Sequence, residues 1–257
     1  MEDLSLVFGT THPVALVTGS GAPRIGNCVA RTLFDRGYRI ALHAHQSVDA
    51  ARTTADELDA GSGDTIVLAA DLSQESEAQA IVDRTHAHFG RLDVLVNCAG
   101  VWRSQPLEET TAGDLQRHFE VNTLATFLCA QRAGLLMVGQ PYGGAIINLG
   151  DWATARPYRD YAAYFPSKGA IPALTRSLAV ELASRNPRIR VNAVLPGPAM
   201  LPNSLSPIER ENAVNATLLH QPGRPEDVAN AVAFLAESRF ITGVCLPVDG
   251  GRTIGSV

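Results

Sequence analysis

The sequence predicts a single α/β domain, spanning 1–257, in which about seven parallel strands form a doubly wound sheet with helices on both faces. Three observations support this fold. Short apolar runs alternate with helical patterns along the chain. The first apolar run leads through a glycine-rich turn directly into a helix. The length of 257 residues suits one large domain that buries most of its apolar surface.

Each predicted strand is a short apolar run bounded by turn residues, as expected for strands buried on both faces. The predicted strands are Pro13–Thr18, Arg39–His43, Thr65–Ala69, Leu92–Val96, Ala145–Leu149, Ile189–Val194 and Val244–Val248. The predicted helices end near Arg36, cover Val48–Leu58, end near Phe89, cover Ala112–Met137 and Tyr161–Ala183, and begin at Pro225. The segment 199–221 is irregular and contains Pro202 and Pro207. We interpret it as a substrate-covering loop, or alternatively as a passive surface insertion.

The composition argues against several classes of protein. The net charge is −5 without a basic block, so nucleic-acid binding has little electrostatic support. No apolar run approaches the roughly eighteen residues of a membrane span, and the acidic start does not resemble a signal peptide. Four scattered cysteines indicate buried free thiols and a cytoplasmic location. The histidines lack ligand spacing beside cysteine, so no metal site is expected.

Tyr164 and Lys168 form the first candidate catalytic pair. They lie four positions apart on one predicted helix, so phenol and ammonium point the same way. A nearby ammonium lowers the pKa of a tyrosine from about 10, which makes the phenol a usable proton donor near neutral pH. Asp151 stands at the end of the preceding strand, where ligands bind in open α/β sheets.

The glycine-rich turn has the context of a dinucleotide-binding Rossmann site, because it follows a strand and opens a helix. Gly19 and Gly26 allow the backbone to approach a pyrophosphate, whose charge meets the N-terminus of the helix near Ile25. The second strand ends in the residues His43-Ala44-His45-Gln46-Ser47, without a carboxylate that would repel a 2′-phosphate. This absence favours NADP(H) as cofactor. The candidate phosphate ligands are Arg24, His45 and Ser47.

These motifs together resemble the short-chain dehydrogenase/reductase family, over nearly the whole chain. The resemblance rests on the glycine-rich turn, the Tyr-x-x-x-Lys pair and the turn Asn97-Cys98-Ala99-Gly100. The family usually has a serine in place of Asp151, and an aspartate there is similar to the pteridine reductase branch. The chain departs from the family pattern by one extra residue before Ile25 and by Arg24 at the central glycine position.

The resemblance implies roles for further residues. Asp71 would hydrogen-bond the adenine amine, although it also stands where it could cap the following helix. Asn122 would help to hold the lysine through water, unless it lies on the solvent face of its helix. Trp102 would stack on a flat substrate against the nicotinamide, or be an ordinary half-buried tryptophan. The remaining implied cofactor contacts are Asn97, Ala99, Gly100, Pro196 and Gly197.

Taken together, these features predict an NADPH-dependent reductase of a pteridine or similar flat heterocycle, with Tyr164 as proton donor. One alternative is a carbonyl reductase of the 3-oxoacyl or sugar-alcohol type, against which an ionised Asp151 would argue by facing a developing alkoxide. The other is a catalytically silent dinucleotide sensor, against which the intact Asn122, Tyr164 and Lys168 argue. Apolar residues on several faces of the two long helices predict a homotetramer.

Overall fold

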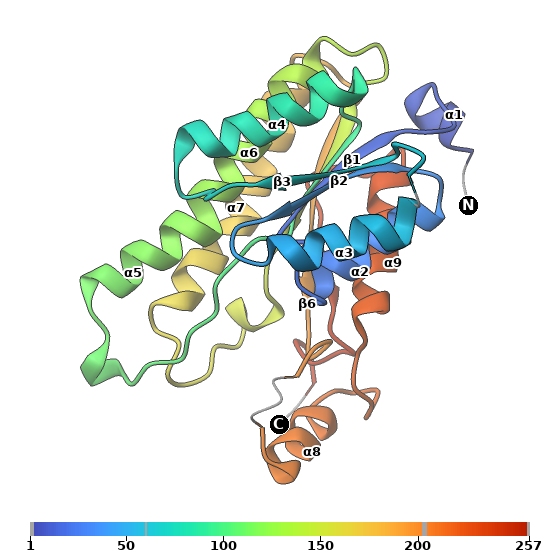
Figure 1. The fold of residues 1–257 in the computed structure, drawn as a ribbon. Helices are drawn as coiled ribbons and strands as arrows, with labels where there is room; N and C mark the ends of the chain where they lie inside the picture. The colour runs from blue at the N-terminus through green and yellow to red at the C-terminus, as the bar shows by residue number, and fades with distance from the viewer. Residues whose placement is uncertain (1–2, 60, 202–204, 256–257) are drawn as a thin grey trace.

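A computed structural model describes residues 3–59, 61–201 and 205–255, and within them seven parallel strands form one sheet (Figure 1). The strands are β1 (Val14–Thr18), β2 (Arg39–Ala44), β3 (Thr65–Ala69), β4 (Val94–Asn97), β5 (Gly144–Leu149), β6 (Ile189–Pro196) and β7 (Cys245–Val248). Their order across the sheet is β3-β2-β1-β4-β5-β6-β7. The predicted doubly wound α/β fold is confirmed, and each strand boundary lies within two residues of its predicted position.

The order of the strands reverses between β1 and β4. β1 pairs with β2 on one side and with β4 on the other. In this register Thr18, at the end of β1, lies opposite Asn97, and Asn97 lies opposite Asn148 of β5. Ligands of doubly wound sheets bind beside such a reversal, at the carboxyl ends of the strands. The topology therefore brings the predicted cofactor and catalytic residues to one edge of the sheet.

Helices cover both faces of the sheet and enclose two apolar cores (Figure 1). One face carries α1 (Leu4–Phe8), α2 (Ile25–Asp35), α3 (Val48–Asp59) and α9 (Pro225–Glu237). The other carries α4 (Glu75–Phe89), α6 (Ala125–Val138) and α7 (Tyr164–Ala183), with α5 (Ala112–His118) preceding α6. Successive side chains of a strand point to opposite faces, so Ala15 and Val17 enter the first core while Val14 and Leu16 enter the second.

The single helix predicted over 112–137 is interrupted by a π-helical turn, Phe119–Leu124, between α5 and α6. Such turns are common at functional sites, and this one contains Asn122. The whole stretch Ala112–Val138 is long and apolar enough to cross a membrane by length and composition, which the sequence prediction overlooked. Half of its most apolar window is buried, and α6 packs against α4 and α7, so we interpret the stretch as part of the core.

The segment 199–221 is partly helical, which corrects the prediction of an irregular loop. α8 (Pro207–Asn215) lies within it, whereas 202–204 fall outside the described residues. Ser206 and Glu209 form a capping box, in which each side chain accepts the backbone N–H of the other. Pro207 occupies the first helical position, where proline is favoured, although the prediction treated it as a break. The nine residues of α8 are all described, and none of them is buried.

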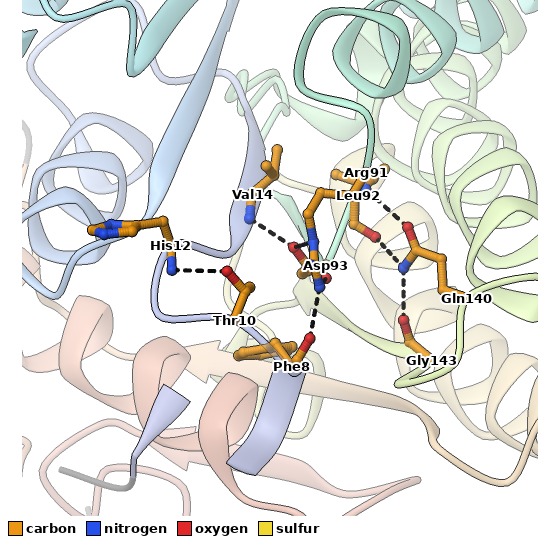
Figure 2. Close-up of polar contacts among 9 residues, drawn as sticks. All are labelled: Phe8, Thr10, His12, Val14, Arg91, Leu92, Asp93, Gln140 and Gly143. Atoms are coloured by element: carbon orange, nitrogen blue, oxygen red, sulfur yellow. Dashed lines mark hydrogen bonds and ion pairs between the residues drawn. The ribbon is translucent and has the colours of Figure 1, made fainter. Parts of the chain in front are cut away.

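At the amino-terminal edge of the sheet, Asp93 joins three segments of the chain (Figure 2). Its fully buried carboxylate accepts the Val14 N–H at 2.8 Å and two N–H groups of Arg91 at 2.7 and 2.6 Å. Arg91 in turn donates to the Phe8 carbonyl at the end of α1, at 2.6 Å. Gln140 lies beside this cluster and bonds the backbone next to the starts of β4 and β5. These contacts hold together the starts of β1, β4 and β5, at the edge of the sheet that lies opposite the predicted site.

Asp93→Ala is expected to lower the free energy of unfolding by about 3 kcal/mol, because the Val14 amide loses its acceptor and the Arg91 guanidinium loses its charge partner. Denaturant titration followed by circular dichroism measures this change. Asp49→Ala is the control, since the Asp49 side chain is 96% exposed and its ion pair with Arg52 should contribute no more than about 1 kcal/mol. Equal losses in the two variants would contradict the role given to Asp93.

Candidate active site

Asp151 and Tyr164 are joined by a hydrogen bond at the carboxyl edge of the sheet. Asp151 follows β5 and caps a short 3-10 turn, because its Oδ1 accepts the Ala153 N–H at 2.8 Å. Tyr164 is the first residue of α7, and its hydroxyl donates to Asp151 Oδ2 at 2.7 Å. Tyr164 is only 5% exposed. The structure thus places two of the predicted catalytic side chains in direct contact.

Burial makes both groups of this pair difficult to ionise. Burial raises the pKa of Asp151, and the hydrogen bond from Tyr164 opposes that rise. The pKa of Tyr164 is raised by burial first and then by the negative charge of Asp151. The expectation that Lys168 lowers the pKa of Tyr164 is therefore wrong for this structure. The phenol is protonated near neutral pH and is available as a donor.

Lys168 lies one helical turn beyond Tyr164, but its ammonium points to the end of β5. Nζ donates to the Leu149 carbonyl at 2.7 Å. Burial lowers the pKa of Lys168, and the charge of Asp151 opposes this effect. A Cβ added at Gly100 would stand 3.5 Å from Nζ, so the turn after β4 passes directly over the ammonium. The structure therefore brings Lys168 and Gly100 together, as predicted for residues of one site.

Asn122 is fully buried, so the alternative that it lies on a solvent face is wrong. Its Nδ2 donates to the Val101 carbonyl and to Ser167 Oγ, both at 3.0 Å, and its Oδ1 accepts the Val101 N–H at 2.8 Å. The side chain thus ties the loop after β4 to the residue that precedes Lys168. The sequence analysis missed Ser167, and its place beside the lysine was the only signal. The water-mediated link to the lysine stays a prediction.

The glycine-rich turn fits the pyrophosphate of a dinucleotide. Gly19 has a φ of +66°, and a Cβ there would stand 2.8 Å from Ala99 Cα. A Cβ on Gly26 would stand 2.5 Å from the Gly19 carbonyl oxygen. α2 begins at Ile25, its N-cap residue Arg24 makes no side-chain capping bond, and its first turn has no acidic residue. The first amides of this helix therefore suit a phosphate group.

The predicted adenosine contacts follow β2 and β3. His45 is exposed, whereas Ser47 is partly buried beside Gly21. Asp71 accepts the Ser73 hydroxyl at 2.8 Å and the Ser73 N–H at 3.0 Å. The bond from the Ser73 hydroxyl is the main cause that lowers the pKa of Asp71, and the nearby His45 adds to it. Asp71 therefore stabilises a local turn but does not cap α4, whose N-cap residue is Gln74, and its contact with adenine stays a prediction.

Pro196 and Gly197 stand where β6 ends beside β7. The Gly197 N–H donates to the Val248 carbonyl at 2.9 Å. A Cβ on Gly197 would stand 2.4 Å from Asp249 Cα, so a side chain does not fit without a shift of the backbone. The turn that the resemblance assigns to the nicotinamide is thus held close to the last strand.

Trp102 belongs to an aromatic cluster near the candidate proton donor. Its ring stacks on Tyr161 with centroids 5.0 Å apart and planes at 10°. Tyr161 meets Tyr164 edge-on at 6.1 Å. Trp102 is 46% exposed, so one face of the indole is covered by Tyr161 while much of the ring remains accessible. A substrate would therefore meet a stacked pair rather than a single ring.

Arg252, which the sequence analysis missed, connects α8 to this edge. Its guanidinium donates to the Ala213 carbonyl of α8 and lies 4.7 Å from the ring centroid of Trp152, the residue after Asp151. This contact links the segment 199–221 to the loop that carries the candidate catalytic carboxylate. A covering role for the segment stays a prediction.

Buried polar side chains at the strand ends support this arrangement, and the sequence analysis assigned a role only to Asn97. Thr18 Oγ accepts the Ala99 N–H at 3.1 Å. Asn97 donates to Asn148 Oδ1 at 3.0 Å, and Asn148 donates to Thr175 Oγ at 3.0 Å. A polar residue that ends an apolar run was the signal for Thr18 and Asn148. These bonds hold β1, β4, β5 and α7 in register at the site.

Comparison with known proteins agrees with this geometry. A family model described as Enoyl-(Acyl carrier protein) reductase matches residues 21–253. The chain is 38% identical to a protein named for ketoacyl reductase 2 of the granaticin polyketide synthase of Streptomyces violaceoruber, over 93% of this chain and 95% of that protein. It is 33% identical to pteridine reductase 1 of Leishmania tarentolae, over 95% and 97%. It is also 33% identical to the human 3-oxoacyl-[acyl-carrier-protein] reductase, over 98% of each chain. The chain therefore belongs to the short-chain dehydrogenase/reductase family and is an NAD(P)-dependent reductase.

Proposed function

We propose that this reductase acts on a pteridine or a similar flat heterocycle, with NADPH as hydride donor. The observation that carries the proposal is the partly buried hydrogen bond between the Tyr164 hydroxyl and Asp151. The serine that is usual in the family would offer one hydroxyl at this place. A carboxyl group beside the phenol instead offers an acceptor for ring N–H or amino groups, next to a donor for ring nitrogen atoms. Pterins carry both kinds of group on one edge, and aliphatic ketones do not.

The proposed reaction reduces a C=N bond of the ring. When bound, NADPH supplies the hydride that the carbon atom receives. Tyr164 gives its hydroxyl proton to the ring nitrogen, and the resulting phenolate is reprotonated from water. Asp151 orients the phenol before the substrate arrives and then accepts a hydrogen bond from the substrate edge. Lys168 would also hold the ribose of the cofactor, as the family resemblance implies.

The aromatic cluster gives further support to a flat substrate. Trp102 and Tyr161 form a stacked pair, and Tyr158 meets Tyr161 edge-on at 5.1 Å. Aromatic rings favour offset stacking or edge contacts with other planar groups. A pterin can add one ring to such a cluster, whereas an extended acyl chain cannot.

A second candidate is a carbonyl reductase of the 3-oxoacyl type, and the comparisons favour it over the pteridine reading. Two of the three relatives named above are ketoacyl reductases by name, and one of them has a higher identity than the pteridine reductase. Against this candidate, Asp151 would face the developing alkoxide of a ketone if it were ionised. The substrate panel below decides between the two candidates. It also tests the sensor alternative, which predicts cofactor binding without turnover.

NADPH is the proposed cofactor because no carboxylate follows β2 to repel its 2′-phosphate. Arg24 and His45 are both exposed at this edge, where they can reach such a phosphate. Ser47 stands beside the glycine turn and offers a hydroxyl. These three side chains are the proposed phosphate ligands.

The homotetramer stays a proposal, and it has support from exposed apolar side chains. Leu124, Leu135 and Val180 are between 43% and 73% exposed on α6, α7 and the π-helical turn that precedes α6. Burying such side chains against a second copy removes apolar surface from water. The cytoplasmic location stays an expectation from the cysteine content.

Tyr164→Phe is expected to reduce turnover by about a hundredfold or more while the dissociation constant for NADPH stays close to the wild-type value. The phenyl ring still packs, but the proton is gone. Steady-state kinetics and fluorescence titration measure the two effects. Tyr142→Phe is the control, because Tyr142 is 43% exposed on the loop between α6 and β5. Near-normal turnover in Tyr164→Phe would remove Tyr164 as the proton donor.

Asp151→Ser, which restores the residue usual in the family, should lose activity on pterins and gain activity on ketones. The measurement is NADPH oxidation with dihydropterins, dihydrofolate and 3-oxoacyl thioesters, for the wild type and the variant. The pteridine proposal fails if the wild type reduces 3-oxoacyl thioesters and ignores pterins, and the carbonyl reductase then takes its place. Cofactor binding without turnover on any substrate would support the sensor alternative.

NADPH is expected to bind at least about tenfold more tightly than NADH, because charged hydrogen bonds to its 2′-phosphate contribute roughly 1.5–3 kcal/mol. Isothermal titration calorimetry with both cofactors measures the ratio. Arg24→Gln and His45→Gln should weaken NADPH binding and leave NADH binding unchanged. A wild-type preference for NADH would show that Arg24, His45 and Ser47 form no phosphate site.

A further inference from the structure

His43 uses both of its ring nitrogen atoms inside the protein. It lies on β2 and is only 2% exposed. Nδ1 is 3.0 Å from the Gly19 backbone nitrogen, which can only donate, so Nδ1 must be unprotonated. Nε2 is 3.1 Å from the Ala70 carbonyl oxygen, which can only accept, so Nε2 must carry the hydrogen. The two contacts together assign one neutral tautomer to this histidine.

The backbone of His43 holds the same turn. The Ser20 N–H donates to the His43 carbonyl at 2.9 Å, and the His43 N–H donates to Ser20 Oγ at 3.1 Å. The two bonds to Ser20 involve only the backbone of His43. The bond from the Gly19 N–H is different, because its acceptor is the His43 side chain. Gly19 is also the residue with the left-handed backbone whose carbonyl packs against Gly26 at the start of α2.

The imidazole therefore bridges two parts of the dinucleotide site. On one side stands Gly19, the first residue of the turn that suits the pyrophosphate. On the other side stands Ala70, the residue before Asp71, which is the predicted adenine contact. Loss of the Gly19 contact frees the amide of a glycine, whose backbone has more accessible conformations than any other residue.

We propose that His43 is a positioning residue for the cofactor: its neutral imidazole holds the Gly19 turn in the conformation that binds a dinucleotide, and protonation of Nδ1 releases that turn. The inference rests on the cofactor that the family implies and not on the identity of the substrate. It makes dinucleotide affinity depend on pH through the contact of His43 with the Gly19 turn. Affinity is full while the ring is neutral and falls as the pH drops through the pKa of His43.

The surroundings of His43 agree with a ring that is neutral at physiological pH. Burial is the main cause that lowers the pKa of His43, the hydrogen bond to Ala70 opposes it, and the charges of His45 and Asp71 act in opposite directions. His45 follows on the same chain segment, Asp71 follows β3, and the exposed Arg24 is the charged residue of the glycine turn. His45 is itself a histidine at the site, so the experiment must separate the two.

Two substitutions by amide residues distinguish the contact of Nδ1 with Gly19 from the contact of Nε2 with Ala70. In His43→Asn the Oδ1 atom takes the place of Nδ1 and accepts the Gly19 N–H without titrating. In His43→Gln the amide reaches the place of Nε2 and leaves Gly19 without an acceptor. His45→Gln is the control for the exposed histidine. The ligand is NAD⁺, because it lacks the 2′-phosphate whose own pKa near 6 would add to the pH dependence.

Calorimetric titration with NAD⁺ between about pH 5 and pH 8 tests the proposal. For the wild type and for His45→Gln, we expect the dissociation constant to rise by up to about tenfold per pH unit below the pKa of His43, because binding must expel one proton. His43→Asn should bind as the wild type does at pH 8 and show no such rise. His43→Gln should bind more weakly at every pH.

The proposal is overturned if His43→Asn keeps the wild-type pH dependence, or if His43→Gln binds as tightly as the wild type at pH 8. It is also overturned if the pH dependence disappears in His45→Gln. Circular dichroism establishes that each variant is folded, and if His43→Gln is not, the contrast between His43→Asn and His45→Gln alone decides. Because the measurement is binding, it is independent of the substrate panel: a failed pterin assay leaves this test intact.

Discussion

The approach of the glycine turn to the turn after β4 sets the geometry of the whole carboxyl edge. These segments are distant in the sequence but adjacent in the sheet, where the order of strands reverses. The left-handed backbone of Gly19 and its missing side chain let the two backbones meet, and Thr18 Oγ accepts amide hydrogens from Cys98 and Ala99. Gly100, the residue after Ala99 in the turn that follows β4, lies over the Lys168 ammonium. A bulkier residue at Gly19 would therefore disturb the cofactor turn and the catalytic helix together.

The two edges of the sheet use buried charge in different ways. At the amino edge the Asp93 carboxylate is paired with Arg91 and bonded to a backbone amide, so its burial is compensated. At the carboxyl edge burial shifts the pKa values of Asp151, Tyr164 and Lys168 away from the charged forms. Among the described residues, the ammonium of Lys168 has the Leu149 carbonyl as its hydrogen-bond acceptor, although it has three N–H groups. The amino edge stabilises the fold, and the carboxyl edge keeps donors available for a ligand.

Alternation of apolar runs and helical patterns was enough to predict the fold. The central strands β1, β4 and β5 are buried on both faces, so their sequences are continuous apolar runs without a period of two. The site was predicted less completely. The spacing of four places Tyr164 and Lys168 on one face of the helix. The lysine side chain has four rotatable bonds, however, and its ammonium reaches the Leu149 carbonyl at the end of β5. The sequence pattern does not predict this direction of the side chain. Pro207 can break a helix or begin one. Here it begins α8, because Ser206 and Glu209 on either side of it form a capping box. His43 looked like any residue of a buried strand, since its function depends on a turn twenty-four positions earlier.

Two titratable groups at this edge, the buried His43 and the partly buried Asp151, respond to pH in opposite ways. His43 must be neutral for the Gly19 turn to keep its conformation, so this half of the site is complete only above a pKa that burial lowers. Asp151 faces the phenol and becomes ionised only above a pKa that burial raises. The same physical cause, removal of a side chain from water, thus moves the two limits in opposite directions. Both shifts favour the neutral form of the side chain, because burial penalises the charged form.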